Sequence, residues 1–576
     1  MTKMRRFAAI AAAAAMTACM AMPMMTGFAA SVTTGNGNTI TVTPSDGATH
    51  KYEAYQIFAG TYSGGVLTDI TWGDGVDGPA LLAALKGDTT LGTYFATCED
   101  AEDVANALAA TSGDPATPVF EDDKANAQAF AKLVAANLTA VTSGSEATNG
   151  VTKLPDGYYL IQDSESPTNP DGSNPNSGAM TRYVVRVTAG ATVEVNAKHS
   201  APTVMKKVEE ESLVGGTMET ADFAGNSAFE LGDGYNDIAD YDIGDAVSFK
   251  LYGTLPSTFD DYAAYYYKFT DTLDSQFNAP AKENVKVYID GKPAQNATVT
   301  VTGQNITVEF ANIKNGNTVN ANSIVTVEYD AVLNNTAEIG LPGQKNAVKL
   351  NYSNNPNWDG SGTSTTGETP EDGVIVFTYG IDINKVDETG TTKLPNAKFA
   401  VKNSAGQYVT ATAGKFSGFV TEAPDVATGS TTTGLFVSSA DSVITIEGLD
   451  AGTYTIVELE APEGYNKLTE GIKVEVAPTM PTDRQAWTYA ADGSTASAAL
   501  TGLSVMYDAE SAQTLGNDGG ATANSGKGTV KIENKRGTSL PGTGGIGTTI
   551  FYVVGGTLVA GAGVTLIAKK RMKKED

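Results

Sequence analysis

The sequence predicts a mainly β protein built from tandem β-sandwiches, with helices inserted into the first of them. The middle and the end of the chain contain short runs of alternating apolar and polar residues, such as VSFKLYG and VTVEYDAVL, the pattern of half-buried antiparallel strands. The first third instead contains three Ala-rich segments with helical spacing, ALLAALKG, DAEDVANALAA and NAQAFAKLVAANLTA. The length of 576 residues favours three or more domains.

The first 30 residues have the pattern of a secretory signal peptide. A start with three cations leads into a long apolar run, and small residues follow at Gly27, Ala29 and Ala30. We expect cleavage after Ala29 or Ala30, so that the remaining chain is exported. The alternative interpretation of this segment is an N-terminal membrane anchor.

A second apolar segment, residues 550–568, lies near the C-terminus and contains no charged residue. It is long enough to cross a bilayer as a helix, and the basic run KKRMKK behind it predicts a cytoplasmic tail. The stretch LPGTG stands ahead of it, where Pro541 restricts the backbone and Gly542 leaves it free. Residues 538–576 are therefore predicted to hold the exported chain at its C-terminal end.

Charge and composition exclude several classes of function. The formal net charge is −28, and both terminal segments are basic, so the exported part is still more acidic and nucleic acid is not an expected partner. Cys19 leaves with the signal peptide, so Cys98 has no partner for an internal disulfide. His50 and His199 are the only histidines and form no pattern for nucleophilic catalysis. We expect no metal and no cofactor, and interpret the acidic run 121–123 as a solvated helix start.

Strand pattern and loop composition divide the exported chain into three predicted domains. They are an N-terminal domain at 31–200 with the helical insertion, a middle sandwich at 201–373 and a C-terminal sandwich at 374–537. A Gly/Ser/Thr-rich loop, DGSGTSTTGETPEDG, ends at the second border.

Three polar residues of the third domain are predicted to face its core. Residues 381–385, IDINK, alternate, so Lys385 points to the same face as the two isoleucines. The same argument puts Glu458 of YTIVELE and Asn534 of VKIEN inward. A buried amine, carboxyl and amide are costly unless they satisfy one another. Burial also lowers the pKa of a lysine and raises that of a glutamate, which favours a neutral nucleophile beside a proton donor.

The second domain contains a comparable set. Lys206 shares the inward parity of its strand, Lys207 faces outward, and YYYKFTDTLD offers Asp271 as the acid. Asn354 shares a face with two apolar neighbours in LNYSNNP, but Asn346 has the same parity and stays open as the alternative. The first domain has no lysine at the matching place, and Asp163 stands where the third domain has its glutamate, so no such set is expected there.

These motifs resemble parts of known Gram-positive surface proteins. LPGTG followed by an apolar span and a basic tail resembles the cell-wall sorting signal, which implies recognition of Leu540 and Pro541 by a sortase and cleavage between Thr543 and Gly544. INKVDETG, LPNAKFAV, YTIVELEAPEGY and IEN resemble the Ig-like collagen-adhesin B-type domain.

The second resemblance implies a self-formed isopeptide bond between Lys385 and Asn534, with Glu458 as the catalytic acid. The middle domain resembles the central domains of sortase-assembled pilins. That resemblance implies a bond from Lys206 to Asn354, with Asp271 as the acid.

The stretch VEVNAK, residues 193–198, resembles the pilin motif VxVYPK, with Asn196 and Ala197 in place of its Tyr and Pro. It implies that Lys198 is joined to Thr543 of the next subunit.

Across nearly its whole length the chain resembles a Spa-type backbone pilin. This implies a structural, non-enzymatic shaft subunit, held covalently on the cell wall after secretion. The implied partners are pilin-specific and housekeeping sortases, identical subunits, minor pilins and peptidoglycan. The alternative is a monomeric wall-anchored adhesin that binds a host matrix protein or glycan. The Lys198 motif favours the polymer, because a monomer needs no acceptor lysine.

Overall fold

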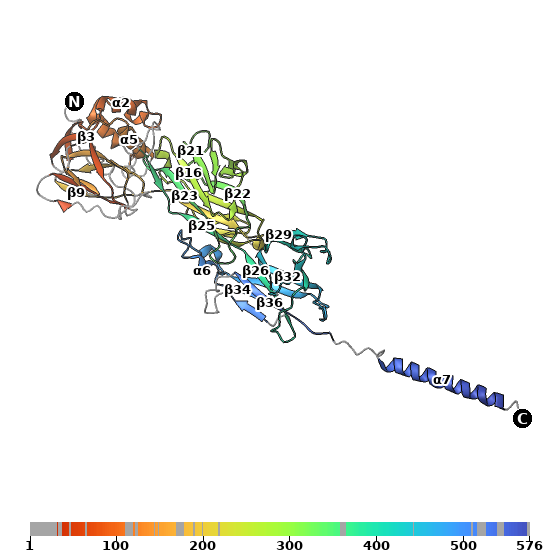
Figure 1. Ribbon diagram of the computed structural model, residues 1–576. Coiled ribbons are helices and arrows are strands. Elements are labelled where there is room, and N and C mark those ends of the chain that lie inside the picture. The colour runs from red at the N-terminus through yellow and green to blue at the C-terminus, as the bar shows by residue number, and fades with distance from the viewer. Residues whose placement is uncertain are drawn as a thin grey trace.

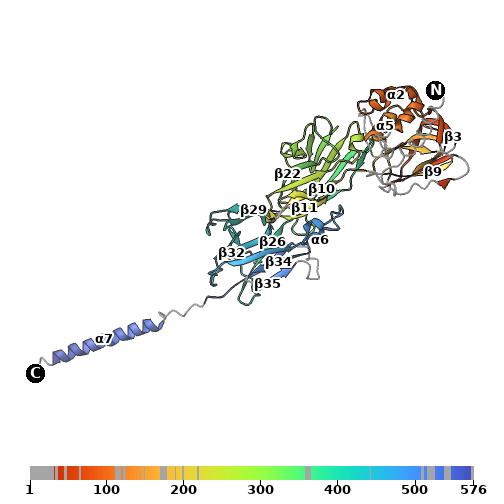
Figure 2. The same cartoon turned by 180° about the vertical axis from the view of Figure 1, so that it is seen from behind.

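The computed structural model of the chain shows β-rich units that follow one another in a row, with helix α7 at the C-terminal end (Figures 1 and 2). The prediction of a mainly β protein is confirmed. The structure describes residues 31–32, 37–44, 48–63, 66–109, 119–120, 125–142, 145–147, 149–168, 178–187, 190–197, 200–216, 219–356, 365–441, 443–507, 511–514, 526–537 and 546–572. The predicted signal peptide, residues 1–30, lies outside the described residues.

The first unit consists of two sheets and a group of helices. The sheets have the strand orders β1-β9-β2-β6-β5 and β4-β3-β7-β8, and the helices lie between β4 and β5 in the chain. Asp77 and Asp100 cap α2 and α4 by accepting hydrogen bonds from backbone N–H groups of the first turn. The elements are β1 Ser31–Val32, β2 Asn38–Pro44, β3 Tyr52–Ser63, β4 Val66–Trp72, α2 Gly78–Gly87, α3 Gly92–Phe95, α4 Ala101–Leu108, α5 Ala125–Ala135, β5 Ser145–Ala147, β6 Gly150–Leu154, β7 Gly157–Asp163, β8 Arg182–Val187 and β9 Ala191–Ala197.

The second unit consists of two sheets whose side chains meet in one core. The first sheet has the order β13-β10-β15-β22-β18-β19, and the second has the order β14-β25-β23-β16-β21-β20. Strand β17 pairs with β22, β24 pairs with β23, and β11 and β12 form a separate hairpin. The strands are β10 Val204–Glu209, β11 Glu219–Phe223, β12 Asn226–Gly232, β13 Tyr235–Asn236, β14 Ile238–Asp240, β15 Ala246–Gly253, β16 Tyr267–Leu273, β17 Phe277–Asn278, β18 Lys286–Ile289, β19 Lys292–Pro293, β20 Thr298–Thr302, β21 Asn305–Phe310, β22 Val325–Leu333, β23 Gln344–Ser353, β24 Thr366–Glu368 and β25 Asp372–Phe377.

The third unit is one continuous sheet with the order β35-β34-β33-β32-β27-β28-β29-β31-β26-β36, and β30 pairs with β27. Its first strand, β26, and its last, β36, are parallel neighbours, although more than 100 residues separate them in the chain. The elements are β26 Tyr379–Asp387, β27 Lys398–Lys402, β28 Tyr408–Thr412, β29 Lys415–Val420, β30 Phe436–Val437, β31 Val443–Leu449, β32 Gly452–Glu460, β33 Ile472–Thr479, α6 Ala496–Ala499, β34 Gly502–Tyr507, β35 Ser511–Thr514 and β36 Lys527–Asn534.

The second and third units are joined without a linker. Strand β25 pairs with β23 of the second unit, and only Thr378 separates it from β26 of the third. The predicted border at 373/374 therefore falls inside β25, and the chain passes from one sheet to the other at Thr378. Buried residues of both units form a single apolar cluster across this junction. Such a continuous core resists bending between the two units.

Gly448 marks the closest approach at this junction and carries a testable prediction. Its carbonyl accepts a hydrogen bond from Ile243 N at 2.9 Å, and a Cβ atom on it would lie 2.3 Å from Ile243 Cδ1. We expect Gly448→Ala to lower the free energy of unfolding by about 1–3 kcal/mol more than Gly406→Ala does. Gly406 has a similar φ of +81°, against +93°, but open space around it, so it controls for backbone strain. Equal losses in chemical denaturation would contradict the steric explanation.

Helix α7, Ile546–Met572, contains the predicted apolar span. Among the described residues it is the one helix that is long and apolar enough to cross a membrane, over Ile550–Lys570, and none of that span is buried against the rest of the chain.

Candidate cross-linking sites

The third unit brings together the three polar residues that its strand pattern predicts to face inward. Lys385 lies on β26, Glu458 on β32 and Asn534 on β36, and each is at most 2% exposed. In the parallel pairing of β26 with β36, Lys385 lies opposite Ile532, so Asn534 follows two residues later on the same face. The first and last strands of the unit therefore present the amine and the amide to one buried space.

The amide of Asn534 is held directly by the carboxyl group. Asn534 Nδ2 donates to Glu458 Oε1 at 2.9 Å and Oε2 at 3.1 Å, and also to the carbonyl oxygen of Asn466 at 3.0 Å. Leu468 N donates to Glu458 Oε2 at 2.7 Å, so the loop after β32 orients the acid. Asn534 Oδ1 is buried and finds no hydrogen-bond donor among the described residues. A buried orphan carbonyl of this kind costs about 1–3 kcal/mol.

The amine of Lys385 is set up as a nucleophile by its surroundings. Burial lowers its pKa to about 8, although the nearby Glu458 carboxylate opposes this shift. Lys385 Nζ donates to two carbonyl oxygens, those of Val386 at 3.0 Å and Ile532 at 3.2 Å. A lysine with this pKa has an appreciable neutral fraction at neutral pH, and only the neutral amine has a free lone pair.

The second unit contains a buried cluster built from both of its sheets. Lys206 on β10 and Tyr329 on β22 come from one sheet, and Asp271 on β16 and Asn346 on β23 from the other. Lys206 Nζ contacts Asp271 Oδ2 and donates to the Tyr329 hydroxyl at 3.1 Å. That hydroxyl donates to Asp271 Oδ1 at 2.8 Å and accepts from Asn346 Nδ2 at 2.7 Å. Asn346 Oδ1 is buried without a donor among the described residues.

Burial shifts the pKa values of this cluster toward the neutral forms. It lowers the pKa of Lys206 and raises that of Asp271, and the attraction between the two opposes both shifts. The pKa of Tyr329 is also raised by burial, and further by the Asp271 charge. Neutralisation by proton transfer from Lys206 to Asp271 leaves a free amine beside a carboxylic acid, the pair that amide attack requires.

The structure brings Asn346, and not Asn354, to this cluster. Asn354 Nδ2 donates to the carbonyl oxygen of Gly178 at 3.3 Å, at the contact between the first and second units. Both asparagines have the same parity, but eight residues of extended strand correspond to about 26 Å. Pairing of β23 with β16 sets Asn346 opposite Leu273, two residues from Asp271. The geometry thus favours the alternative, Asn346, over Asn354 as the asparagine of this cluster.

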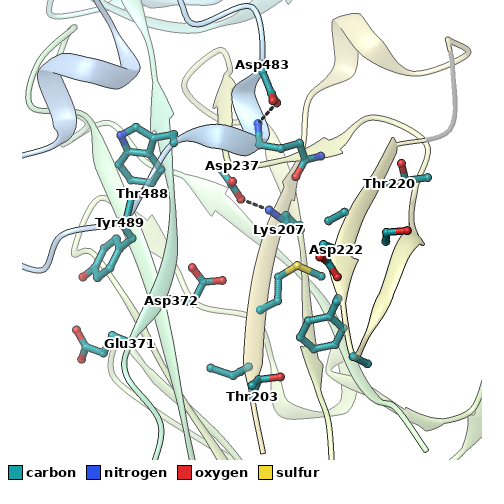
Figure 3. A pocket seen from close by; sticks show the side chains of 18 residues that line it. Thr203, Lys207, Thr220, Asp222, Asp237, Glu371, Asp372, Asp483, Thr488 and Tyr489 are labelled. Atoms are coloured by element: carbon teal, nitrogen blue, oxygen red, sulfur yellow. Dashed lines mark hydrogen bonds and ion pairs between the residues drawn. The ribbon is translucent and has the colours of Figure 1, made fainter. Parts of the chain in front are cut away.

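Lys207 points to the opposite face from Lys206, as its parity predicts, but it is not exposed. It is 5% exposed, and its Nζ donates to Asp237 Oδ1 at 2.5 Å (Figure 3). The pair lines a groove of about 720 Å³, whose walls include the β11–β12 hairpin and the stretch 483–489 of the third unit. A segment distant in sequence therefore covers the face that the local pattern predicts to be solvated.

The first unit uses its matching acid differently. Asp163 Oδ1 lies 2.7 Å from His50 Nδ1, and Asp163 Oδ2 accepts from the backbone N and the hydroxyl of Thr181 at 2.7 and 3.0 Å. The absence of a cross-link from this unit stays a prediction.

Two groups of predicted residues lie outside the described residues. They are the acceptor Lys198 and the sorting-signal residues Leu540, Pro541, Thr543 and Gly544.

Tyr329 is a further residue of the cluster in the second unit that the sequence analysis did not predict, although the strand pattern around it indicates an inward side chain. The alternation of VTVEYDAVL sets Tyr329 on the same face as its buried valines.

Comparisons with known proteins identify a domain and an anchor motif in the C-terminal part of the chain. Residues 380–488 match the SpaA prealbumin-like fold domain, and residues 532–576 match the LPXTG cell wall anchor motif. The trypsin-resistant surface T6 protein of Streptococcus pyogenes serotype M6 is 30% identical over 283 residues. That match covers 42% of this chain and 48% of the relative, so the chain spans about half the length of the curated relative.

Among solved structures, the T6 backbone pilin of serotype M6 S. pyogenes aligns with a TM-score of 0.45 at 15% identity, over 88% of this chain and 100% of that one. The full-length major pilin SpaD from Corynebacterium diphtheriae aligns with a TM-score of 0.41 at 13% identity, over 88% and 98%. The anchor motif confirms the predicted attachment to the cell wall. The chain is therefore a cell-wall-anchored surface protein with a SpaA-type prealbumin-like domain, and over 283 residues it is similar to the T6 protein of S. pyogenes.

Proposed function

We propose that this chain is the shaft subunit of a covalent cell-surface pilus. Sortase joins Thr543 of one subunit to Lys198 of the next, and two internal isopeptide bonds, Lys385–Asn534 and Lys206–Asn346, staple each subunit. The observation that carries the proposal is the pair of buried lysine, acid and asparagine clusters in consecutive units. One such cluster is expensive to bury, and two that each combine a lysine, a carboxylic acid and an asparagine indicate one shared chemistry.

The bond-forming step needs no group from outside the chain. A neutral lysine Nζ attacks the asparagine Cγ, the new C–N bond forms and the Cγ–Nδ2 bond breaks. Counted from its ammonium form, the lysine loses two protons. The first goes to the acid and makes the amine neutral, and the second leaves with Nδ2 as part of ammonia. Glu458 and Asp271 act as the acids that take up and return these protons.

The position of the bonds fits a chain under tension. Force in such a polymer enters a subunit at Lys198 and leaves at Thr543, so the second and third units lie on its path and the first does not. In the third unit the bond joins the first strand to the last. In the second it joins the first strand to β23, close to the exit of the chain. Tension between the joined residues then passes through the covalent bonds, and the strands that lie between these residues in the chain stay folded.

A shaft subunit of this kind has several partners. It is joined to identical subunits and minor pilins by a pilin-specific sortase, and a housekeeping sortase attaches the finished polymer to peptidoglycan. The chain itself is structural: it forms its own internal cross-links and is a substrate of sortase.

Polymerisation tests the proposal. In cells that express the chain with its sortase, we expect a ladder of detergent-resistant polymers whose junction peptides join Thr543 to Lys198. Lys198→Arg should abolish the ladder and leave a wall-anchored monomer, because an arginine side chain has no free amine to accept the acyl group. Lys132→Arg, at an exposed lysine of the first unit, should preserve it. A wild-type chain that stays monomeric would instead support the adhesin alternative.

A further inference from the structure

The two clusters differ in how the acid reaches the leaving nitrogen. In the third unit Glu458 accepts directly from Asn534 Nδ2. In the second unit the acid is an aspartate, one methylene shorter, and among the described residues it has no hydrogen bond to Asn346. The Tyr329 hydroxyl lies between them, 2.8 Å from Asp271 Oδ1 and 2.7 Å from Asn346 Nδ2.

We propose that Tyr329 is a catalytic proton relay for the Lys206–Asn346 bond. The inference rests on the proposed self-cross-linking. It assigns to the second unit a four-residue site in which a tyrosine hydroxyl replaces the direct contact between acid and leaving group.

The bonding of the hydroxyl supports a relay. A tyrosine O–H has one donor and two acceptor positions. Here all three are used: it donates to Asp271, and it accepts from Asn346 Nδ2 and from Lys206 Nζ at 3.1 Å. One oxygen therefore contacts the nucleophile, the acid and the leaving nitrogen.

The buried setting of Tyr329 suits transfer without a lasting charge. Its pKa is raised by burial, so a tyrosinate does not accumulate. The ring also lies 5.3 Å from Lys206 Nζ, and the Phe249 ring lies 5.2 Å from it on the same face, which keeps water away from the amine.

In the proposed reaction two protons leave Lys206 Nζ by different routes. Lys206 passes one proton to Asp271 Oδ2, and its nitrogen lone pair attacks Asn346 Cγ. As the Cγ–Nδ2 bond breaks, Tyr329 gives its hydroxyl proton to Nδ2 and takes the second proton from Nζ. The products are the secondary amide, neutral ammonia, a protonated Asp271 and an unchanged Tyr329.

The test is Tyr329→Phe in the full chain, made by cell-free synthesis and sampled over time. Peptide mapping by mass spectrometry follows each cross-link separately. We expect formation of the Lys206–Asn346 bond to slow about 100-fold or more, the range of a lost general acid–base group. The Lys385–Asn534 bond should form at its normal rate and report that synthesis and folding proceed.

A matched variant separates relay from packing. Tyr267→Phe removes another buried hydroxyl of the same unit, which donates to the carbonyl oxygen of Thr254 at 2.9 Å, and should leave both rates unchanged. In the wild type, the Lys206–Asn346 bond should form more slowly in D₂O than in H₂O. The slow residual reaction of Tyr329→Phe should show a smaller solvent isotope effect, because proton transfer through the tyrosine is gone. An unchanged rate in Tyr329→Phe overturns the relay. No Lys206–Asn346 bond in the wild type overturns the proposed cross-link itself.

Discussion

Glu458→Gln is expected to leave the third unit without its proposed cross-link, so the purified chain should be heavier than the wild type by about the mass of one ammonia. The glutamine keeps the size of the side chain, but its amide neither takes up a proton from the amine of Lys385 nor releases one as an acid. It also turns an acceptor of the Asn534 amide and of Leu468 N into a mixed donor and acceptor. The wild-type chain should fall short of its sequence mass by two ammonias and the variant by one.

The loss of stability should be large. A link that closes a loop of more than 100 residues contributes about 4–5 kcal/mol by analogy with the loop entropy of a disulfide. Chemical denaturation should show this loss in the variant. The matched control is Glu460→Gln, on the same strand, which removes an exposed ion pair to Lys398 at 2.9 Å. It should keep both bonds and lose at most about 1 kcal/mol. A complete Lys385–Asn534 bond in Glu458→Gln would contradict the assigned role of the acid.

Asn346→Ala is expected to remove the second proposed cross-link, whereas Asn354→Ala should keep it. In the first variant Lys206 and Asp271 stay buried with no amide to attack, so peptide mapping should find an unmodified Lys206. The loop between these positions also exceeds 100 residues, so a stability loss of about 4–5 kcal/mol is again expected.

The Asn354→Ala variant serves as the comparison within the same strand region. Among the described residues, the side-chain hydrogen bond that it removes is the one to the carbonyl oxygen of Gly178 at the contact with the first unit. We expect a loss of about 1 kcal/mol and a normal mass deficit of two ammonias. The reverse pattern, with the bond lost in Asn354→Ala and kept in Asn346→Ala, would show that the strand register in solution differs from the one described.

Alternation along single strands was enough to select most of the candidate site. It placed Lys385, Glu458 and Asn534 inward from three separate stretches, and it selected Lys206 over Lys207. A period of two is a local property of extended backbone, so it survives any arrangement of the sheets. For the same reason it could not separate Asn346 from Asn354, which share a parity and differ only in their place along the chain.

Long-range contacts account for what the local pattern missed. Lys207 faces away from the core of its own sandwich, yet the stretch 483–489 and Asp237 cover it. Strand β25 follows a loop that suggests a border, but it completes the second sheet before the chain turns into the third. The strand that bears Tyr329 was recognised, but the contact of its hydroxyl with the acid on the facing sheet is a property of the pairing of the two sheets.

The sequence by itself determined the mainly β class, the anchoring segment and the inward face of the candidate strands, because each of these depends on residues close together in the chain. Only the tertiary structure decided which asparagine lies in the cluster of Lys206, that the Tyr329 hydroxyl lies between this asparagine and the acid, and where the chain passes from one sheet to the next. These depend on strand register and on the facing of two sheets, and a shift of a few residues along a strand moves a side chain by many ångströms without changing its parity.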